Sequence, residues 1–199
     1  MTRKTRREIL NDGCYAHVMS RAVDGRFIFR DEQDFEVFKE YLRTKKEEHG
    51  FLLHHYCLMN THFHLLVRMG EVKKFSQALQ TIKWKYTHWY NRRYRRMGPL
   101  WRERFKSLLV ENERYLYACG LYIEYNPVEA GLVIRSEEWA NSSSRHYFDG
   151  SPDDLITRYE MQELPEGIDV RRRETFTQGD VIGSDLFKLY CEEELCPAI

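Results

Sequence analysis

Apolar and polar residues alternate along four short segments of the chain, which is the pattern of β-strands that cover a core with one face. The first segment spans residues 14–20 (CYAHVMS). Two more apolar segments, residues 51–59 and 62–69, are separated only by Asn60-Thr61, which predicts a hairpin of two central strands. The run SLLVE at residues 107–111 is the fourth segment. We therefore expect a sheet of four strands.

Apolar positions three to four residues apart predict three helices between and after these strands. The first covers residues 31–49, where Asp31 can cap the start and Gly50 can end the helix. The second covers residues 72–90 and the basic run that follows. The third starts near residue 113, and we expect Pro127 to end it because proline lacks the N–H that a helix needs.

The resulting order β, α, β, β, α, β, α favours an α+β fold. We expect a ferredoxin-like or RRM-like sandwich, in which a central antiparallel sheet carries both long helices on one face. Residues 1–148 would form this domain. Residues 149–199 show weak periodicity and many acidic residues, so we expect them to form an irregular, acidic C-terminal extension.

The charge of the chain is balanced overall but unevenly distributed. Its 31 Lys and Arg residues offset 31 Asp and Glu residues, which at first argues against a nucleic-acid partner. Between residues 82 and 106, however, a single acid, Glu103, stands among nine basic residues. These are Lys83, Lys85, Arg92, Arg93, Arg95, Arg96, Arg102, Arg104 and Lys106. A basic stripe on a neutral protein still creates a local positive field, so we expect this stretch to bind DNA.

Aromatic residues are interleaved with the basic stretch. They are Trp84, Trp89, Tyr90, Tyr94 and Trp101. Aromatic rings beside Lys and Arg are typical of surfaces that bind single-stranded nucleic acid, although some of these rings must belong to the core. Arg21 and Arg104 are further candidates for contact with a phosphate, or else for pairing with structural carboxylates.

Cysteine content and hydropathy indicate the cellular setting. The five cysteines are an odd number without a CxxC pair, which indicates reduced thiols rather than disulfides or a structural zinc site. No stretch approaches the roughly 18 to 20 apolar residues of a membrane helix. The basic N-terminus is not followed by the apolar run of a signal peptide. We therefore expect a cytoplasmic protein with no membrane partner.

The segment His62-Phe63-His64 contains a candidate metal site. Alternation along a strand places both imidazoles on one face, about 6.6 Å apart. Asn126 could supply an amide oxygen as a third ligand, which leaves positions open for a phosphate oxygen. Mg²⁺ or Mn²⁺ suits such a site better than zinc, and two nitrogen ligands favour Mn²⁺ as a substitute for Mg²⁺. Taken alone, a histidine pair in a strand is more often structural than metal-binding.

Tyr122 is the candidate nucleophile because a helix would place it one turn before Asn126, about 5 to 6 Å away. At an unperturbed pKa of about 10, only about a thousandth of its phenol is ionised at neutral pH, so a base must assist. His54, His55, Glu124 and metal-bound water are equal candidates for that base. His54 and His55 are expected to face opposite ways, so that one of them could support a metal-binding histidine.

A series of motifs carries a resemblance to a known family. The motifs are YAHVMSRAV, YCLMNTHFHLLVRM, LWRERFKSLLVE, YIEYNPVEAGLV and EEWANSSSRHYFDG, which together span residues 13–150. In this order they resemble the REP-associated tyrosine transposases, relatives of the single-tyrosine HUH transposases that mobilise insertion sequences. One departure is the pair Asn60-Thr61, where the family usually has Pro-Asn before the first metal-binding histidine.

The resemblance implies a metal-dependent endonuclease that cleaves and rejoins single-stranded DNA beside imperfect palindromic hairpins. It assigns the metal to His62 and His64, the nucleophile to Tyr122 and the third ligand to Asn126, where mobile relatives more often carry Gln. Attack by the tyrosine would leave a 5′-phosphotyrosine and a free 3′-hydroxyl. Because the covalent bond conserves the phosphodiester energy, rejoining would need no nucleotide cofactor, and no glycine-rich phosphate loop is present.

Two other functions remain open from the sequence. The first is a domesticated, non-catalytic protein of the same fold that binds hairpin DNA or RNA. The second is a different metallohydrolase that uses His54, His55, His62 and His64, although such an enzyme would not need the basic aromatic helix. The sequence favours a monomer over a homodimer, since the repeat-associated relatives can complete the site within one chain.

Overall fold

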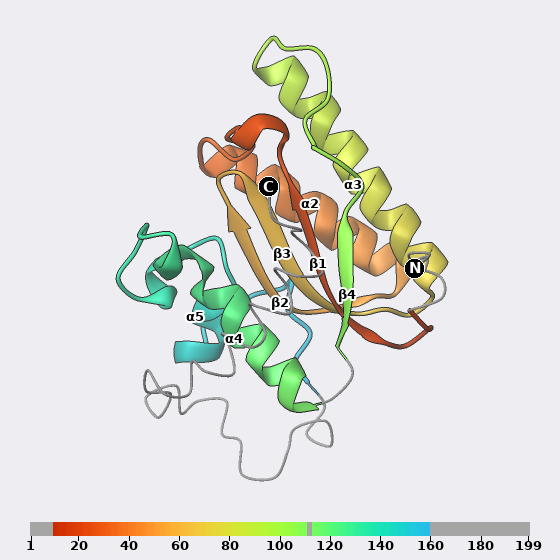
Figure 1. Cartoon of the computed structure of the whole chain (residues 1–199), viewed down its shortest axis with the longest axis vertical. Coiled ribbons are helices and arrows are strands. Elements are labelled where there is room, and N and C mark those ends of the chain that lie inside the picture. The colour runs from red at the N-terminus through yellow and green to blue at the C-terminus, as the bar shows by residue number, and fades with distance from the viewer. Residues whose placement is uncertain (1–9, 111–112, 160–199) are drawn as a thin grey trace, which may run out of the picture.

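The computed structural model describes residues 10–110 and 113–159, and it contains an antiparallel sheet with the strand order β2-β3-β1-β4 (Figure 1). The strands are β1 (Tyr15–Arg21), β2 (Leu52–Met59), β3 (His62–Arg68) and β4 (Lys106–Val110). All neighbouring strands pair antiparallel. Alternation of apolar and polar residues thus located all four strands to within a residue or two at their ends.

Three long helices cover the sheet, on both of its faces. They are α2 (Glu32–His49), α3 (Val72–Arg93) and α4 (Glu113–Glu129). Short elements follow or connect them: η1 (Val23–Gly25), η2 (Ser136–Glu138) and α5 (Ser144–Asp149). In Figure 1, α2 and α3 pack side by side behind the sheet, while α4 lies in front of it. The expected α+β sandwich, with both long helices α2 and α3 on one face, is confirmed, and α4 closes the other face.

Local capping signals explain the ends of α2. The side chain of Asp31 accepts a hydrogen bond of 3.2 Å from the backbone N–H of Asp34, which satisfies a free donor of the first turn. Gly50 follows the helix with a φ of 67°, a left-handed conformation that costs glycine little. Both predicted boundaries of this helix are confirmed.

The two faces of the sheet bury different kinds of side chains. Toward α2 and α3, the strands contribute apolar residues such as Val18, Phe63 and Leu65, which join Phe38 and Tyr86 in the main core. The residues between them point toward α4. Those residues include a smaller apolar cluster with Met19, Cys57 and Leu66, and several buried histidines.

The predicted end of α4 at Pro127 is wrong, because the helix continues through Glu129. Proline at this position has no N–H for the carbonyl of Ile123, four residues earlier. The side-chain amide of Asn126 donates instead, to the carbonyl oxygens of Ile123 at 3.3 Å and Tyr122 at 2.8 Å. These side-chain hydrogen bonds replace the missing backbone bond, and the helix continues past Pro127 to Glu129. Asn112 precedes the helix, and its residue type could cap the first turn, but it lies outside the described residues.

The segment after α4 runs along the free edge of β2. The backbone N–H of Leu58 donates to the carbonyl of Asn141, and that of Ser143 donates to the carbonyl of Tyr56. Further on, the N–H of Thr157 donates to the carbonyl of Leu53. The part of the predicted acidic extension from Gly150 to Tyr159 therefore packs on the domain, whereas residues 160–199 lie outside the described part of the chain.

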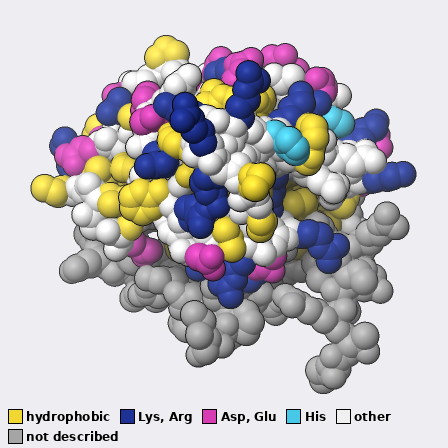
Figure 2. All heavy atoms as spheres, turned by 90° about the horizontal axis from the view of Figure 1, so that it is seen from above, with side chains coloured by type: hydrophobic (Ala, Val, Ile, Leu, Met, Phe, Trp, Pro, Cys, Tyr) yellow, Lys and Arg dark blue, Asp and Glu magenta, His cyan; other side chains and the backbone are white. Residues whose placement is uncertain are grey.

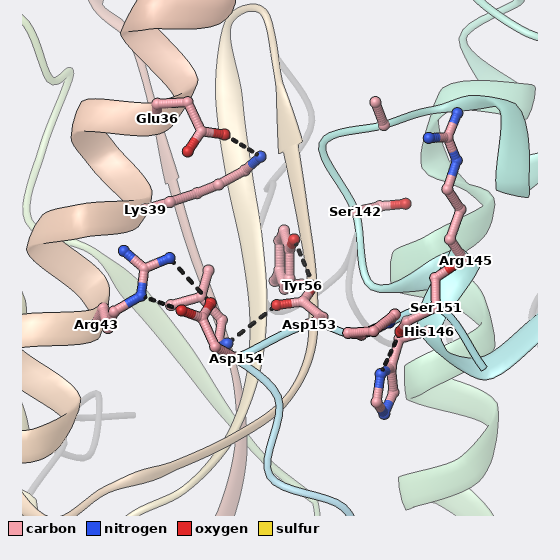
Figure 3. A pocket seen from close by; sticks show the side chains of 13 residues that line it. Glu36, Lys39, Arg43, Tyr56, Ser142, Arg145, His146, Ser151, Asp153 and Asp154 are labelled. Atoms are coloured by element: carbon pink, nitrogen blue, oxygen red, sulfur yellow. Dashed lines mark hydrogen bonds and ion pairs between the residues drawn. The ribbon is translucent and has the colours of Figure 1, made fainter.

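A polar cavity of about 480 Å³ separates this segment from α2 (Figure 3). Its charged groups largely neutralise one another. The hydroxyl of Tyr56 donates to Asp153 at 2.8 Å, and the guanidinium of Arg43 donates two hydrogen bonds to Asp154, at 2.6 and 2.9 Å. These contacts fasten the segment to β2 through Tyr56 and to α2 through Arg43, so we attribute the cavity to the packing of this segment on the domain.

Cys14, Cys57 and Cys119 are free thiols, as expected, and the other two cysteines fall outside the described residues. No helix among residues 10–110 and 113–159 is long and apolar enough to cross a membrane.

Candidate functional site

His62, His64 and Tyr122 meet between the sheet and α4. Both histidines lie on β3 and face α4, with ring centroids 5.0 Å apart. The ring of Tyr122 stands edge-on to His64 at 6.0 Å and an interplanar angle of 90°. The three residues that the sequence singled out from two distant segments thus form one site.

His17 is a further member of this site that the sequence analysis missed. Its Nε2 lies 2.8 Å from Nδ1 of His64, and the two rings stack with centroids 5.1 Å apart. Its ring also faces Tyr122 edge-on at 6.0 Å. Alternation places His17 and Arg21 on the same face of β1, but only the pairing of β1 with β3 brings His17 to His64.

Burial keeps the site histidines neutral. Burial lowers the pKa of His17 to about 3. Burial and the positive charge of Arg21 lower the pKa of His62 to about 4. The pKa of His64 falls well below its usual value, mainly through burial and also through the neighbouring His62, His17 and Arg21. Neutral imidazoles retain a lone pair, which is the form that binds a metal ion.

The ring nitrogens of the pair fit a divalent metal ion. Nε2 of His64 is buried and has no hydrogen-bond partner within the described part of the chain, which is costly unless a ligand binds it. Its other nitrogen faces His17, as expected for a supporting residue that fixes the tautomer of a metal-binding histidine. His62 contacts the hydroxyl of Thr61 through Nδ1 at 2.9 Å, which leaves its Nε2 for a ligand.

A third protein ligand would have to be of another type. Within residues 10–110 and 113–159, no group of three or more His, Cys, Asp or Glu side chains could hold a metal ion. Asn126 lies one turn after Tyr122 on α4, and its Nδ2 is engaged with helix carbonyls. Its Oδ1 is therefore the atom that could accept or coordinate a partner.

Arg21 lies beside the histidine pair. It is the cross-strand partner of His62 in the β1–β3 register, and its side chain is exposed. No carboxylate of the described residues forms an ion pair with it. Its guanidinium is therefore available to an anion that approaches the histidines.

The prediction that His54 and His55 face opposite ways is wrong. A β-bulge between Leu53 and His55 shifts the register of β2, and both imidazoles turn toward the α4 side of the sheet. His54 stacks on Tyr159 with ring centroids 4.4 Å apart. His55 lies 2.8 Å from the carboxylate of Glu124, so both histidines have partners other than His62 and His64.

Glu124 and His55 bind each other rather than Tyr122. Side chains two residues apart on a helix do not face each other, and Glu124 points to β2 while Tyr122 points to β3 and β1. This geometry argues against either of them as the direct base for the phenol.

Three residues of the basic stretch are engaged within the protein. Lys83 is buried and donates to Ser20 Oγ at 2.7 Å and to the carbonyl of Glu103 at 2.8 Å. Arg93 binds Asp31 and Asp34, each at 2.7 Å. Lys106 pairs with Glu103 at 3.4 Å. Other basic residues of the stretch are exposed: Lys85, Arg92, Arg95, Arg102 and Arg104.

Among the interleaved aromatic rings, Tyr90 is buried in the core, whereas Trp84 is 59% exposed. Figure 2 looks onto the end of the molecule where α3 finishes, and Lys and Arg side chains spread across the middle of this face. Acidic side chains lie mostly toward its edge. This end of the sheet also carries Arg21 and His62, because β1 ends and β3 begins there.

The antiparallel sheet presents His62 and His64 of a central strand to a tyrosine on a helix, which is the arrangement that the resemblance to single-tyrosine transposases implied. The chain belongs to the IS200-like transposase family, whose model matches residues 10–126. This match confirms the resemblance that the motif series indicated.

A solved structure described as "Structure of the REP associates tyrosine transposase bound to a REP hairpin" is similar in fold. The TM-score is 0.64 at 18% sequence identity, over 85% of this chain and all of the other. A comparison with curated proteins finds no match.

Proposed function

We propose that this protein is a metal-dependent endonuclease and strand transferase for single-stranded DNA, which acts beside repetitive palindromic hairpins through a 5′-phosphotyrosine intermediate. The observation that carries the proposal is the position of Tyr122 against His64, whose buried Nε2 has no hydrogen-bond partner among residues 10–110 and 113–159. Membership of a transposase family and a structural neighbour described as bound to a REP hairpin support the same function.

Each site residue has a role in this proposal. His62 and His64 would hold Mg²⁺ or Mn²⁺ through Nε2, and Oδ1 of Asn126 would be the third protein ligand. The bound ion would supply Lewis-acid polarisation of the scissile phosphate. Arg21 binds a non-bridging phosphate oxygen, and His17 holds the ring of His64 in place.

The covalent step is a transesterification. The phenolic oxygen of Tyr122 attacks phosphorus and forms an O–P bond, while the bond from phosphorus to the 3′ oxygen breaks. The phenol loses its proton to a base in the solvent of the site, and the leaving 3′ oxygen takes up a proton to become a hydroxyl. Rejoining is the reverse attack by a 3′-hydroxyl, so no nucleotide or redox partner is consumed.

The exposed basic residues provide a surface for the DNA strands. Their charges neutralise phosphates along the strand, and Trp84 offers a ring for stacking of an unpaired base. Lys83 and Arg93 contribute less to DNA binding, because Lys83 donates a hydrogen bond to Ser20 and Arg93 forms an ion pair with Asp34. A single chain supplies both histidines and the tyrosine, which supports a monomer as the active form.

The test is a denaturant-resistant adduct between the protein and hairpin oligonucleotides with single-stranded flanks, in the presence of Mn²⁺. Tyr122→Phe should abolish the adduct and leave hairpin affinity unchanged, because only the nucleophilic oxygen is lost. Tyr125→Phe is the matched control, since Tyr125 is 46% exposed on the same helix and should behave as the wild type.

The outcome separates the rival functions. Tight hairpin binding without an adduct, across a broad panel of flanking sequences, would favour the non-catalytic binding protein. The four-histidine metallohydrolase is already disfavoured, because His54 and His55 contact Tyr159 and Glu124 instead of joining His62 and His64.

A further inference from the structure

A buried polar network ties α4 to β2 next to the candidate site. The carboxylate of Glu124 accepts hydrogen bonds from Ser143 Oγ at 2.7 Å and from Nδ1 of His55 at 2.8 Å. All three residues are buried, and Glu124 is only 1% exposed. The ring of Tyr147 stacks on His55 with centroids 4.3 Å apart. The chemistry proposed above uses none of these groups.

Several local features of the chain serve this network. His55 alternates with Cys57 and Met59 along β2, which places its imidazole on the side of the sheet that faces α4. Gly120 faces His55 from α4, and a Cβ atom there would lie 2.5 Å from Nε2 of His55. Only glycine at this position allows the helix to approach the imidazole so closely. Ser143 is held in turn by Tyr56: the backbone N–H of Ser143 donates to the carbonyl of Tyr56, and the N–H of Tyr56 donates to Ser143 Oγ.

The network controls the rotation of α4 about its own axis. Successive residues of a helix are about 100° apart, so Glu124 and Tyr122 leave α4 in nearly opposite directions. Leu116 and Ile123 of α4 are buried in apolar contacts, which are not directional. The hydrogen bonds of Glu124 are directional, and they fix which way Tyr122 points.

Small rotations would matter for the reaction. Side-chain atoms about 5 to 6 Å from the helix axis move by about 2 Å when the helix turns by about 20°. A displacement of about 1 Å in a reacting group can cost about 10²-fold in rate.

We propose that His55, Glu124 and Ser143 form a positioning network that holds the Tyr122 hydroxyl in line with the phosphate bound at His62 and His64. This inference rests on the proposed function of Tyr122, and it adds three residues that touch neither the DNA nor the metal ion. Glu124 is the central member because both hydrogen bonds end on its carboxylate.

The experiment measures the rate constant of adduct formation at saturating hairpin DNA and Mn²⁺, together with hairpin affinity and Tm. Glu124→Ala should slow adduct formation about 10- to 100-fold at unchanged hairpin affinity. Glu124→Gln keeps an acceptor of the same size and should restore most of the rate. Ser143→Ala removes one of the two hydrogen bonds to Glu124. Its rate of adduct formation should lie between those of Glu124→Ala and Glu124→Gln.

Leu116→Ala serves as a control for a merely structural role. It opens a cavity under the same helix and lowers Tm without touching the network. At a temperature well below the Tm of every variant, it should form the adduct at nearly the wild-type rate. The exposed carboxylate of Glu138, which bonds to Arg135 after α4, provides a surface control as Glu138→Ala.

Three results would overturn the inference. They are a wild-type rate in Glu124→Ala, equal rate losses in Glu124→Ala and Leu116→Ala, and no rescue by Glu124→Gln in a folded protein. Failure of the proposed function looks different, because the wild type itself would then form no adduct with any oligonucleotide, and the positioning role would fall with it.

Discussion

The two faces of the sheet differ sharply although the same strands build both. The face toward α2 and α3 buries aromatic and aliphatic side chains such as Phe38, Phe63 and Tyr86. The face toward α4 buries His17 and His64 among fewer apolar residues. Because side chains alternate along a strand, each step of one residue changes between these environments.

The difference indicates that one face of the sheet mainly stabilises the fold and that the other contains the candidate site. The face toward α2 and α3 contains the larger cluster of buried apolar residues, while the α4 face includes polar groups whose hydrogen bonds are incompletely satisfied. Nε2 of His64 is such an atom. Unsatisfied buried groups cost stability, and a ligand that binds such an atom would offset this cost.

The largest effect should come from the apolar face. Phe38→Ala removes a fully buried ring that packs on Phe29, Phe63 and Tyr86, and it should lower the free energy of unfolding by about 3 to 5 kcal/mol. Urea denaturation followed by circular dichroism measures this change. A loss below about 1 kcal/mol would show that this face does not dominate stability.

A smaller and different effect should come from the α4 face. His17→Phe keeps a buried ring of similar size but removes the contact with Nδ1 of His64, and it should weaken Mn²⁺ binding about 10- to 100-fold. Titration calorimetry gives the affinity, with Tm measured in parallel. His88→Phe, on the exposed side of α3, is the control and should bind Mn²⁺ as the wild type does. An unchanged affinity in His17→Phe would contradict the supporting role.

The smallest effect should come from the exposed basic residues at the end of the sheet that carries Arg21 and His62. Arg104→Gln should weaken binding to all hairpin sequences by a similar, few-fold factor and reduce the slope of log affinity against log salt by about 1. Fluorescence anisotropy at several salt concentrations measures both. Arg43→Gln removes a charge that is paired with Asp154 away from this end, and it should leave the slope unchanged.

Local signals predicted most of the fold. The alternation in β1 to β4 and the capping residues Asp31 and Gly50 depend on a few neighbouring residues, and the structure agrees with them. Pro127 misled the prediction because its missing N–H is compensated by the side chain of Asn126, a rescue that depends on side-chain conformation.

The candidate site was predictable only in part, since its completion depends on contacts between distant segments. His62, His64 and Tyr122 stood out through their motifs. His17 did not, because its contact with His64 forms only when β1 pairs with β3, and no local spacing in the sequence shows this contact. The bulge at His54 has no local signal either, and it reversed the expected orientation of one imidazole.

The strip of chain from Asn141 to Thr157 has a consequence for association between molecules. By bonding to Leu58, Tyr56 and Leu53, it occupies hydrogen-bonding groups through which β2 could recruit a foreign strand. The opposite border, β4, is only five residues long and begins with Lys106. A short edge strand that begins with a charged residue is a poor template for the addition of another strand. Both edges of the sheet therefore disfavour the edge-to-edge pairing that leads to aggregation.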